Sequence, residues 1–492
     1  MGWQRVLDCI AAGDLSAADR AAEAIDDATV ASRDWQRWIQ NLIQAEDWEM
    51  ARLALRRAMR AGAPSRTLRH QYALVLDRCG AVHEAQLELE RLVEEAMDSP
   101  QLVAHLASVL THEGRSRDAE KKLIAGLERW PADPQLHTAL AQLRWMLGDV
   151  DYATARLRKA IRELPAELHL RLVAADVLRK GGLPEQALEV LEVGLRMAPE
   201  SAGLLTSIGV VLDDLGRPQQ ALQYLYQAVR SAPDSAVVRR NLVPSLLRLG
   251  RGEEALQRCE ELLRAAPDDQ QLIAYRATAL RLLGSPAYGQ LYDYDRLVRC
   301  YRPRPPAGYA SIHEFNRVLA SRLSLLHRQD RRPLDQSLRG GTQTQRNLPL
   351  SDPAIAAFFA MVDEGIRDYI AALRGASDHP TDRRRSSRYR VAGSWSVELQ
   401  PGGFHVNHVH PMGWLSSAYY VEVPQELADP VSRGGWLKFG EPGFTVPGCD
   451  PEHFVQPQAG LLVLFPSCLW HGTVPFAAGQ RRLTIAFDAI AC

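Results

Sequence analysis

The sequence has almost no net charge and no long apolar run. Its 58 lysines and arginines are offset by 59 aspartates and glutamates, so the formal charge at pH 7 is -1. A chain without an excess of either sign has no general attraction to nucleic acid or to an anionic membrane. The sequence contains no run of about 18 apolar residues, and its first residues show no apolar signal region. We therefore expect a cytoplasmic protein with no membrane association.

Cysteine is scarce. Seven cysteines are scattered over 492 residues without paired spacing. An odd and scattered set indicates a reducing compartment rather than a disulfide framework. The length exceeds that of one ordinary hydrophobic core, so we expect at least two domains.

Glycine, alanine and proline recur with one period in the first part of the chain. Seven glycines stand 34 residues apart: Gly80, Gly114, Gly148, Gly182, Gly216, Gly250 and Gly284. Alanines follow six of them by five residues: Ala85, Ala119, Ala153, Ala187, Ala221 and Ala255. Prolines keep the same period: Pro131, Pro165, Pro199, Pro233 and Pro267. This pattern predicts a helix ended by glycine, a second helix packed closely at alanine, and a proline stop.

The period and the small–large pattern resemble the tetratricopeptide repeat over roughly residues 33–295. Residues 1–32 read as a degenerate leading unit, in which Ala17 keeps the alanine phase. Such arrays stack into a superhelix whose concave face holds a peptide or a protein. We therefore expect a protein or peptide partner there, with pure scaffolding as the alternative. The repeat domain is expected to span residues 1–302.

From residue 303 the pattern changes. Two segments have helical periodicity, and short β segments separated by glycine and proline fill about residues 392–490. The expected fold class is therefore multidomain: an all-α repeat solenoid followed by a double-stranded β-helix (jelly-roll) domain with flanking helices at 303–492. The polar segment 338–344 is expected to be an ordered loop.

A basic run precedes the β segments. It contains Arg383, Arg384, Arg385, Arg388 and Arg390. It has no interleaved aromatic residues of the kind that bind single strands. We interpret it as a solvated loop, and do not expect nucleic acid as a partner.

Three histidines lie within six positions, in "HVNHVHP" (405–411). In a strand, alternate side chains share a face, so His408 and His410 point the same way, about 7 Å apart. His405 has the opposite parity and should face away. Two imidazoles need a third ligand from elsewhere, and the candidate is His471 in "FPSCLWHGTVPF". The alternative is that these histidines only form hydrogen bonds in a cupin-like core.

Arg482 and Thr484 share one face of the last β segment. An arginine that points into a β-sandwich is costly to bury unless an anion meets it. A guanidinium beside a hydroxyl suits a dicarboxylate.

Together these residues resemble the 2-oxoglutarate- and Fe(II)-dependent oxygenases, specifically the branch often fused to tetratricopeptide repeats. The likeness is carried by "QSLRGGTQT" (336–344), "HVHPMGWLSSAYYVEVP" (408–424), "GGWLKF" (434–439) and the segment 460–488. It implies that His408, His410 and His471 hold Fe(II), and that Arg482 and Thr484 bind the distal carboxylate of 2-oxoglutarate, with Tyr420 as a third contact. The catalytic set is then the three histidines and Arg482, with O2 as oxidant and ascorbate as a supporting reductant.

One position departs from the wider superfamily, which uses His-x-Asp/Glu with a distal histidine. Here the acidic position is His410, so three neutral ligands leave the iron with one more positive charge, and another metal becomes an alternative. The resemblance implies a hydroxylase acting on a protein or peptide recruited by the repeats. The alternatives are a small-molecule oxygenase, a three-histidine dioxygenase without 2-oxoglutarate, and a non-catalytic scaffold. Segment 338–344 is either a lid over the site or a static loop.

Overall fold

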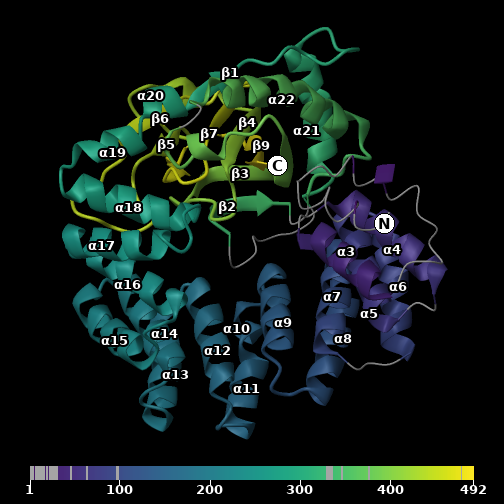
Figure 1. The fold of residues 1–492 in the computed structure, drawn as a ribbon, viewed down its shortest axis with the longest axis vertical. Helices are drawn as coiled ribbons and strands as arrows, with labels where there is room; N and C mark the ends of the chain where they lie inside the picture. Colours follow the sequence, from purple (N-terminus) through teal and green to yellow (C-terminus); the bar gives the residue numbers. More distant parts are fainter. Residues whose placement is uncertain are drawn as a thin grey trace. The chain divides into compact units, whose positions relative to one another are not determined.

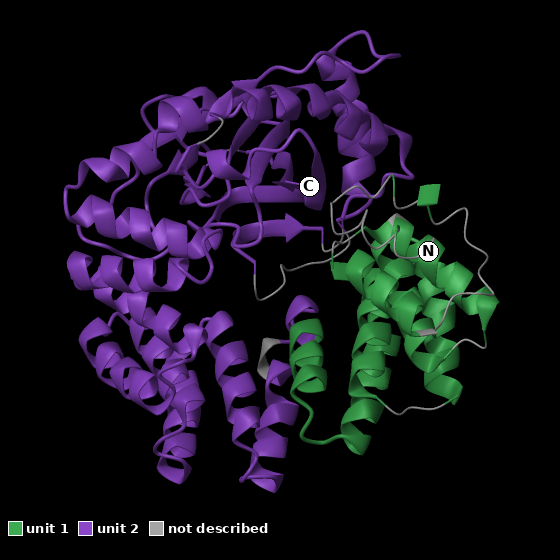
Figure 2. Cartoon of the chain, viewed as in Figure 1, with its two compact units in different colours: residues 1–143 green, residues 144–492 purple. Residues whose placement is uncertain are grey.

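The chain forms two compact units in a computed structural model, residues 1–143 and 144–492 (Figure 2). The structure describes residues 5, 17, 20–21, 32–44, 47–62, 65–95, 99–327, 336–344, 347–374, 377–477 and 479–491. The degenerate unit predicted at 1–32 therefore lies almost wholly outside the described residues. The predicted boundary near residue 302 falls inside the second unit and remains a prediction about domains.

The first unit consists of paired helices. They are α3 (Ser32–Gln44), α4 (Trp48–Ala61), α5 (Arg66–Arg78), α6 (Val82–Glu95), α7 (Pro100–His112), α8 (Ser116–Arg129) and the greater part of α9 (Pro134–Met146). Successive helices pack on one another through buried apolar side chains such as Trp38, Leu42 and Leu55. This is the packing that the repeat pattern predicts.

The helical repeats continue in the second unit (Figure 1). Their helices are α10 (Val150–Ala153), α11 (Ala155–Glu163), α12 (Leu168–Lys180), α13 (Pro184–Met197), α14 (Ala202–Asp214), α15 (Pro218–Ser231), α16 (Ala236–Arg248), α17 (Gly252–Leu263), α18 (Gln270–Leu282) and α19 (Pro286–Leu291). The turn glycines have positive φ, for example 81° at Gly182 and 72° at Gly216, which explains why glycine recurs there. The predicted all-α repeat solenoid is confirmed.

Two β-sheets follow the repeats. The larger has the strand order β1-β7-β4-β9-β3-β2 and the smaller β6-β5-β8. The strands are β1 (Arg299–Tyr301), β2 (Leu338–Gln343), β3 (Tyr389–His405), β4 (Leu415–Glu422), β5 (Leu437–Phe439), β6 (His453–Val455), β7 (Leu462–Pro466), β8 (His471–Thr473) and β9 (Arg482–Ala491). All pairings are antiparallel. The sheet-rich C-terminal domain is thus confirmed.

The larger sheet is covered on one face by helices. These are α21 (Ile312–Ser324) and α22 (Pro353–Ala372), whose Phe315 and Phe358 share a core with Leu483 and Ile485 of β9. On the other face, Phe465 of β7 packs against Phe439 of β5, with ring centroids 5.0 Å apart. The two sheets therefore pack face to face, as a jelly-roll requires.

The repeat helices and the smaller sheet share one hydrophobic core. Leu272 and Ala277 of α18 belong to the same buried cluster as Leu437 and Phe439 of β5. In Figure 1, α18 and α19 run beside β5 and β6. The short helix α20 (Tyr294–Leu297) leads from the last repeat into β1. The β domain is thus packed against the repeats rather than merely tethered to them.

The segment 338–344 is not a loop. Residues Leu338–Gln343 form β2, the edge strand paired with β3. A Cβ at Gly341 would lie 2.2 Å from the carbonyl oxygen of Glu398, and one at Gly403 would lie 2.3 Å from that of Gly340. The glycines therefore allow the two backbones to approach closely. The prediction of an ordered loop or lid is wrong, because these glycines serve strand pairing.

The basic run is only partly solvated. Arg383 donates to Asp268 of the last full repeat, at 2.7 Å, and Arg384 donates to the carbonyl of Gly413 at 3.0 Å. Burial lowers the pKa of Arg384. The solvated-loop prediction is wrong for Arg384, which is partly buried against the β domain; Arg383 is exposed, as predicted, but pairs with the repeats.

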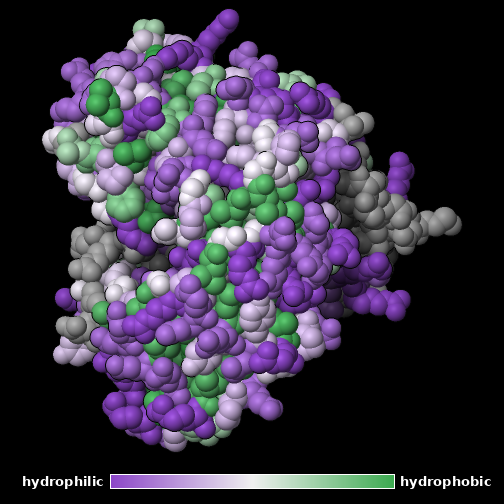
Figure 3. Space-filling view, turned by 90° about the vertical axis from the view of Figure 1, so that its left-hand side faces the viewer, coloured by the Kyte–Doolittle hydropathy of each residue, from purple (hydrophilic) through white to green (hydrophobic). Residues whose placement is uncertain are grey.

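The surface is mostly hydrophilic on the face seen in Figure 3, where hydrophobic residues occur in scattered patches. Among the described helices, none combines the length and the apolar character needed to cross a membrane.

Candidate metal centre

His408 and His471 meet through a short antiparallel bridge. The backbone N–H of His408 donates to the carbonyl of His471 at 2.9 Å, and the reverse bond measures 3.1 Å. Two residues later, the N–H of His410 donates to the carbonyl of Ser467 at 3.0 Å. These bonds hold the histidine segment against the chain that leads into β8.

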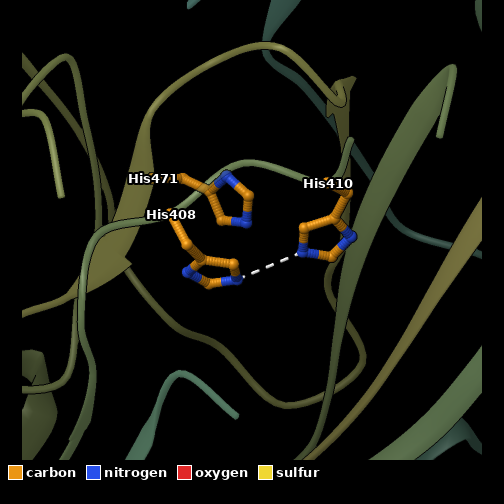
Figure 4. Close-up of side chains that lie close together, drawn as sticks. All are labelled: His408, His410 and His471. Carbon is orange, nitrogen blue, oxygen red and sulfur yellow. Dashed lines mark hydrogen bonds between the residues drawn. The ribbon is translucent and has the colours of Figure 1, made fainter. Parts of the chain in front are cut away.

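The three imidazoles converge (Figure 4). One ring nitrogen from each of His408, His410 and His471 lies within 4.8 Å of the other two. The Nε2 atoms of His408 and His410 are 3.1 Å apart. The structure thus brings together the three residues proposed as ligands from sequence, although they come from segments 61 to 63 residues apart along the chain (471 minus 410 and 471 minus 408).

The Nδ1 atom of each ring has an acceptor of its own. His408 Nδ1 lies 2.8 Å from the carbonyl of Val406, and His471 Nδ1 lies 2.9 Å from that of Leu469. His410 Nδ1 lies 2.6 and 2.7 Å from the two carboxylate oxygens of Asp488. We assign the proton to Nδ1 on this basis, which leaves each Nε2 with a lone pair. Two lone pairs 3.1 Å apart cannot hydrogen-bond, whereas a cation between the rings satisfies both.

The site favours uncharged imidazoles. Burial, with the neighbouring His410, lowers the pKa of His408 to about 3. Burial also lowers the pKa of His471 well below its usual value. A metal ligand must be a neutral ring, so these residues are ready to ligate without losing a proton. Three neutral nitrogens with oriented Nδ1–H groups fit a divalent transition metal such as Fe(II).

His405 does not face away from the other histidines. Its ring centroid lies 5.9 Å from that of His408, and its Nδ1 is 2.9 Å from the hydroxyl of Ser337. The predicted orientation is wrong because β3 ends at His405. Beyond the end of a strand, the alternation of faces no longer applies.

Asp488 is a further candidate residue of the site, and it was not predicted from the sequence. Besides His410, its carboxylate accepts a hydrogen bond from the hydroxyl of Ser416 at 2.7 Å. Strand alternation could have identified it, because positions 482, 484, 486 and 488 share one face of a regular strand. In the structure all four line the same cavity. In the wider superfamily a carboxylate is itself a metal ligand. Here the carboxylate of Asp488 contacts the candidate ligand His410 instead.

Arg482 is buried beside the metal centre without an anionic partner among the described residues. The residue is 3 % exposed, and its Nη1 donates to the carbonyl of Gly435 at 2.8 Å. Its Nε has no hydrogen-bond partner, nor does the buried hydroxyl of Tyr420, whose ring lies 5.1 Å from the guanidinium carbon. Burial lowers the pKa of Arg482 and raises that of Tyr420. Orphaned donors in this position fit a carboxylate.

The three histidines and Arg482 line one cavity of about 990 Å³. The three histidines, Arg482, Thr484 and Asp488 lie along it, while Leu483 and Ile485 face the helices on the other side of the sheet. The prediction that Arg482 and Thr484 share one face of β9 is therefore correct. Tyr420 is fully buried, and its ring packs against the guanidinium of Arg482.

The comparisons with known proteins match two parts of the chain to different families. Residues 393–488 match the family described as "Putative 2OG-Fe(II) oxygenase", which confirms the resemblance noted in the sequence. Residues 106–167, 172–236 and 214–278 match tetratricopeptide-repeat families. No curated protein matches the chain.

Similar solved structures are repeat proteins. A thermophilic tetratricopeptide-repeat protein of Thermus thermophilus is 30% identical, with a TM-score of 0.30, and the match covers 37% of this chain and 100% of that one. A tetratricopeptide-repeat protein of Parabacteroides merdae is 15% identical, with a TM-score of 0.34, over 51% of this chain and 98% of that one.

Proposed function

We propose that this chain, whose residues 393–488 match the 2-oxoglutarate–Fe(II) oxygenase family, is a 2-oxoglutarate- and Fe(II)-dependent hydroxylase of a protein or peptide. The observation that carries the proposal is the juxtaposition of three converging Nε2 atoms with a buried arginine that has no anionic partner among the described residues. The first set fits the metal and the second fits a dicarboxylate.

His408, His410 and His471 would hold the iron. When bound, iron supplies the oxidation in which substrate, O2 and 2-oxoglutarate give hydroxylated substrate, succinate and CO2. The chain's own residues position the reactants. Arg482 and Thr484 would fix the distal carboxylate, with the Tyr420 hydroxyl as a further donor.

A polypeptide substrate is favoured by what lines the cavity. Its wall includes Arg179 and Lys180 at the end of α12, Gly182 and Pro184 beyond it, and Asp214 at the end of α14. A substrate reaching the metal centre therefore passes the repeats, and we propose that their concave face recruits it.

The scattered cysteines of the sequence support a cytoplasmic location.

Uncoupled turnover tests the proposal. The full-length protein is incubated with Fe(II), 2-oxoglutarate, O2 and ascorbate, and succinate is measured. We expect succinate from the wild type and none from His471→Ala, which should also lose Fe(II) binding. His169→Ala is the matched control, because His169 lies on α12 with its ring beside Glu167. Absence of succinate at every iron loading favours a non-catalytic scaffold, and undiminished iron binding by His471→Ala removes the ligand assignment.

A further inference from the structure

Among the described residues, four lysine and arginine side chains line the cavity, and one of these four has neither an observed nor a proposed carboxylate partner. Arg179 donates to Asp214 at 3.0 Å, and Lys180 lies 2.7 Å from Asp176. Arg482 is assigned above to the co-substrate. Arg339 has no acidic partner among the described residues.

Arg339 is held in place by its own strand. It lies on β2 opposite Phe404, and its Nη1 donates to the carbonyls of Gln336 and Leu338 at 3.0 and 2.8 Å. Guanidinium carries five N–H donors, so those on Nε and Nη2 remain available. Burial lowers the pKa of Arg339, but arginine stays charged at neutral pH. The close approach of Gly341 to Glu398 fixes β2, so the charge has a defined position.

The co-substrate does not account for this charge. 2-Oxoglutarate has two carboxylates, of which one belongs with the metal and the other with Arg482 under the proposed function. A half-buried guanidinium on the wall of a cavity is costly to desolvate unless it meets an anion there. The remaining reactant is the substrate.

The surroundings of the metal centre supply apolar contacts for that substrate. The ring of Trp395 lies 5.5 Å from that of His410 and lines the cavity. Met412, two residues after His410, also lines the cavity and is 87% exposed. An exposed methionine and an aromatic ring on the same cavity suit an adaptable contact with a peptide.

We propose that Arg339 is a specificity-determining residue that binds an anionic side chain of the polypeptide substrate, a carboxylate or a phosphate. The inference rests on the proposed function, since it assigns Arg482 to the co-substrate. It narrows the substrate class to acidic or phosphorylated segments, with apolar residues meeting Trp395 and Met412.

A peptide library tests the inference. Short random peptides with a fixed central Asp, Glu, phosphoserine, Asn or Lys are bound to the full-length protein loaded with Mn(II) and 2-oxoglutarate without O2. We expect the wild type to enrich Asp and Glu peptides, or phosphoserine peptides, roughly tenfold over Asn peptides. Which of these peptides is enriched shows whether Arg339 binds a carboxylate or a phosphate. Arg339→Gln should lose the preference, and Arg339→Lys should keep part of it.

The matched control is Arg264→Gln, because Arg264 is exposed and its Nε donates to the carbonyl of Glu260 in the preceding helix α17. Arg339→Gln should keep the 2-oxoglutarate affinity and the unfolding temperature of the wild type. Equal binding of all arms, or an anion preference unchanged in Arg339→Gln, overturns the inference. A loss of 2-oxoglutarate affinity in Arg339→Gln also overturns it, because Arg339 would then serve the co-substrate. The succinate assay is independent, so succinate without anion preference refutes this inference and leaves the oxygenase proposal standing.

Discussion

The indole N–H of Trp470 donates to the hydroxyl of Thr278, 3.0 Å away. Trp470 directly precedes His471, and Thr278 lies on the repeat helix α18. Nearby, the hydroxyl of Tyr292 donates to the carbonyl of Cys468 at 2.6 Å and accepts from the N–H of Trp470 at 3.3 Å. The last repeat thus supports the segment that carries a candidate metal ligand. The repeats are part of the scaffold of the centre as well as a surface for recruitment.

Thr278→Val should weaken both the fold and the metal centre. The change leaves a buried indole N–H without an acceptor, which costs about 1–3 kcal/mol. We expect a lower unfolding temperature and a several-fold weaker Fe(II) affinity, measured by thermal unfolding and anaerobic titration. Thr278→Ser, which keeps the hydroxyl, should restore both.

Thr206→Val is the matched control for this change. Thr206 lies on α14 and, like Thr278, donates to the carbonyl four residues earlier, but its hydroxyl has no bond to the β domain among those observed. The control should leave Fe(II) affinity unchanged. If Thr278→Val binds Fe(II) as tightly as the wild type, the repeats do not support the metal centre.

Arg482→Gln should reduce 2-oxoglutarate affinity by roughly 10- to 100-fold, because a charge-assisted bond to a buried carboxylate is lost. Fe(II) affinity should stay unchanged. Arg481→Gln is the control, since Arg481 points to the opposite face and bonds Glu398 at 2.6 Å and Glu422 at 3.1 Å. Unchanged 2-oxoglutarate affinity in Arg482→Gln would place the co-substrate elsewhere.

Tyr420→Phe separates the role of the hydroxyl in binding from its role in folding. The Tyr420 hydroxyl is buried without a partner, so its removal should not destabilise the protein without co-substrate. It should still lower 2-oxoglutarate affinity several-fold if the hydroxyl donates to the distal carboxylate. Calorimetric binding and thermal unfolding measure the two effects. Equal affinity in both proteins would exclude Tyr420 from the pocket.

Asp488→Asn should weaken Fe(II) binding by about 10- to 100-fold, the usual effect of losing a carboxylate behind a metal-bound histidine. The amide still accepts a bond from His410 but carries no charge. Anaerobic competition with a chelator gives the dissociation constant. Asp363→Asn serves as control, because Asp363 on α22 bonds Arg367 and Tyr389. Wild-type Fe(II) affinity in Asp488→Asn would show that the outer carboxylate does not compensate for the missing acidic ligand.

The sequence predicts best where one local rule governs a segment. The repeats follow from glycines whose positive φ ends each first helix, as at Gly182. The two faces of β9 follow from alternation within a regular strand, which places Arg482 and Thr484 together. These features need no knowledge of distant residues.

Prediction fails where a rule stops applying or where contacts are long-range. Alternation ends with β3, so His405 was misplaced. The two glycines of β2 have the composition of a loop but serve close strand pairing. Phe444, Trp470 and Tyr275 pack together with ring centroids about 6 Å apart, and no local pattern connects them.

Asp213 should make the stability of the repeats depend on pH. It lies at the end of α14, accepts a bond from the hydroxyl of Ser245 at 2.6 Å, and burial raises its pKa from 3.8 to about 6. Below about pH 3 the carboxyl is protonated in both the folded and the unfolded states. As the pH rises towards 6, the unfolded state ionises first, so the contribution of Asp213 to folding stability is lost by up to about 3 kcal/mol.

Asp213→Asn tests this dependence, because the amide keeps an acceptor for Ser245 and cannot ionise. The variant should gain unfolding temperature relative to the wild type as the pH is raised from 4 to 7, by several degrees in total. Ser245→Ala removes the bond that lowers the pKa of Asp213, so this pKa should rise further. In this variant the loss of folding stability should therefore continue to higher pH than in the wild type. A difference between Asp213→Asn and wild type that stays constant across this range would contradict the shifted pKa.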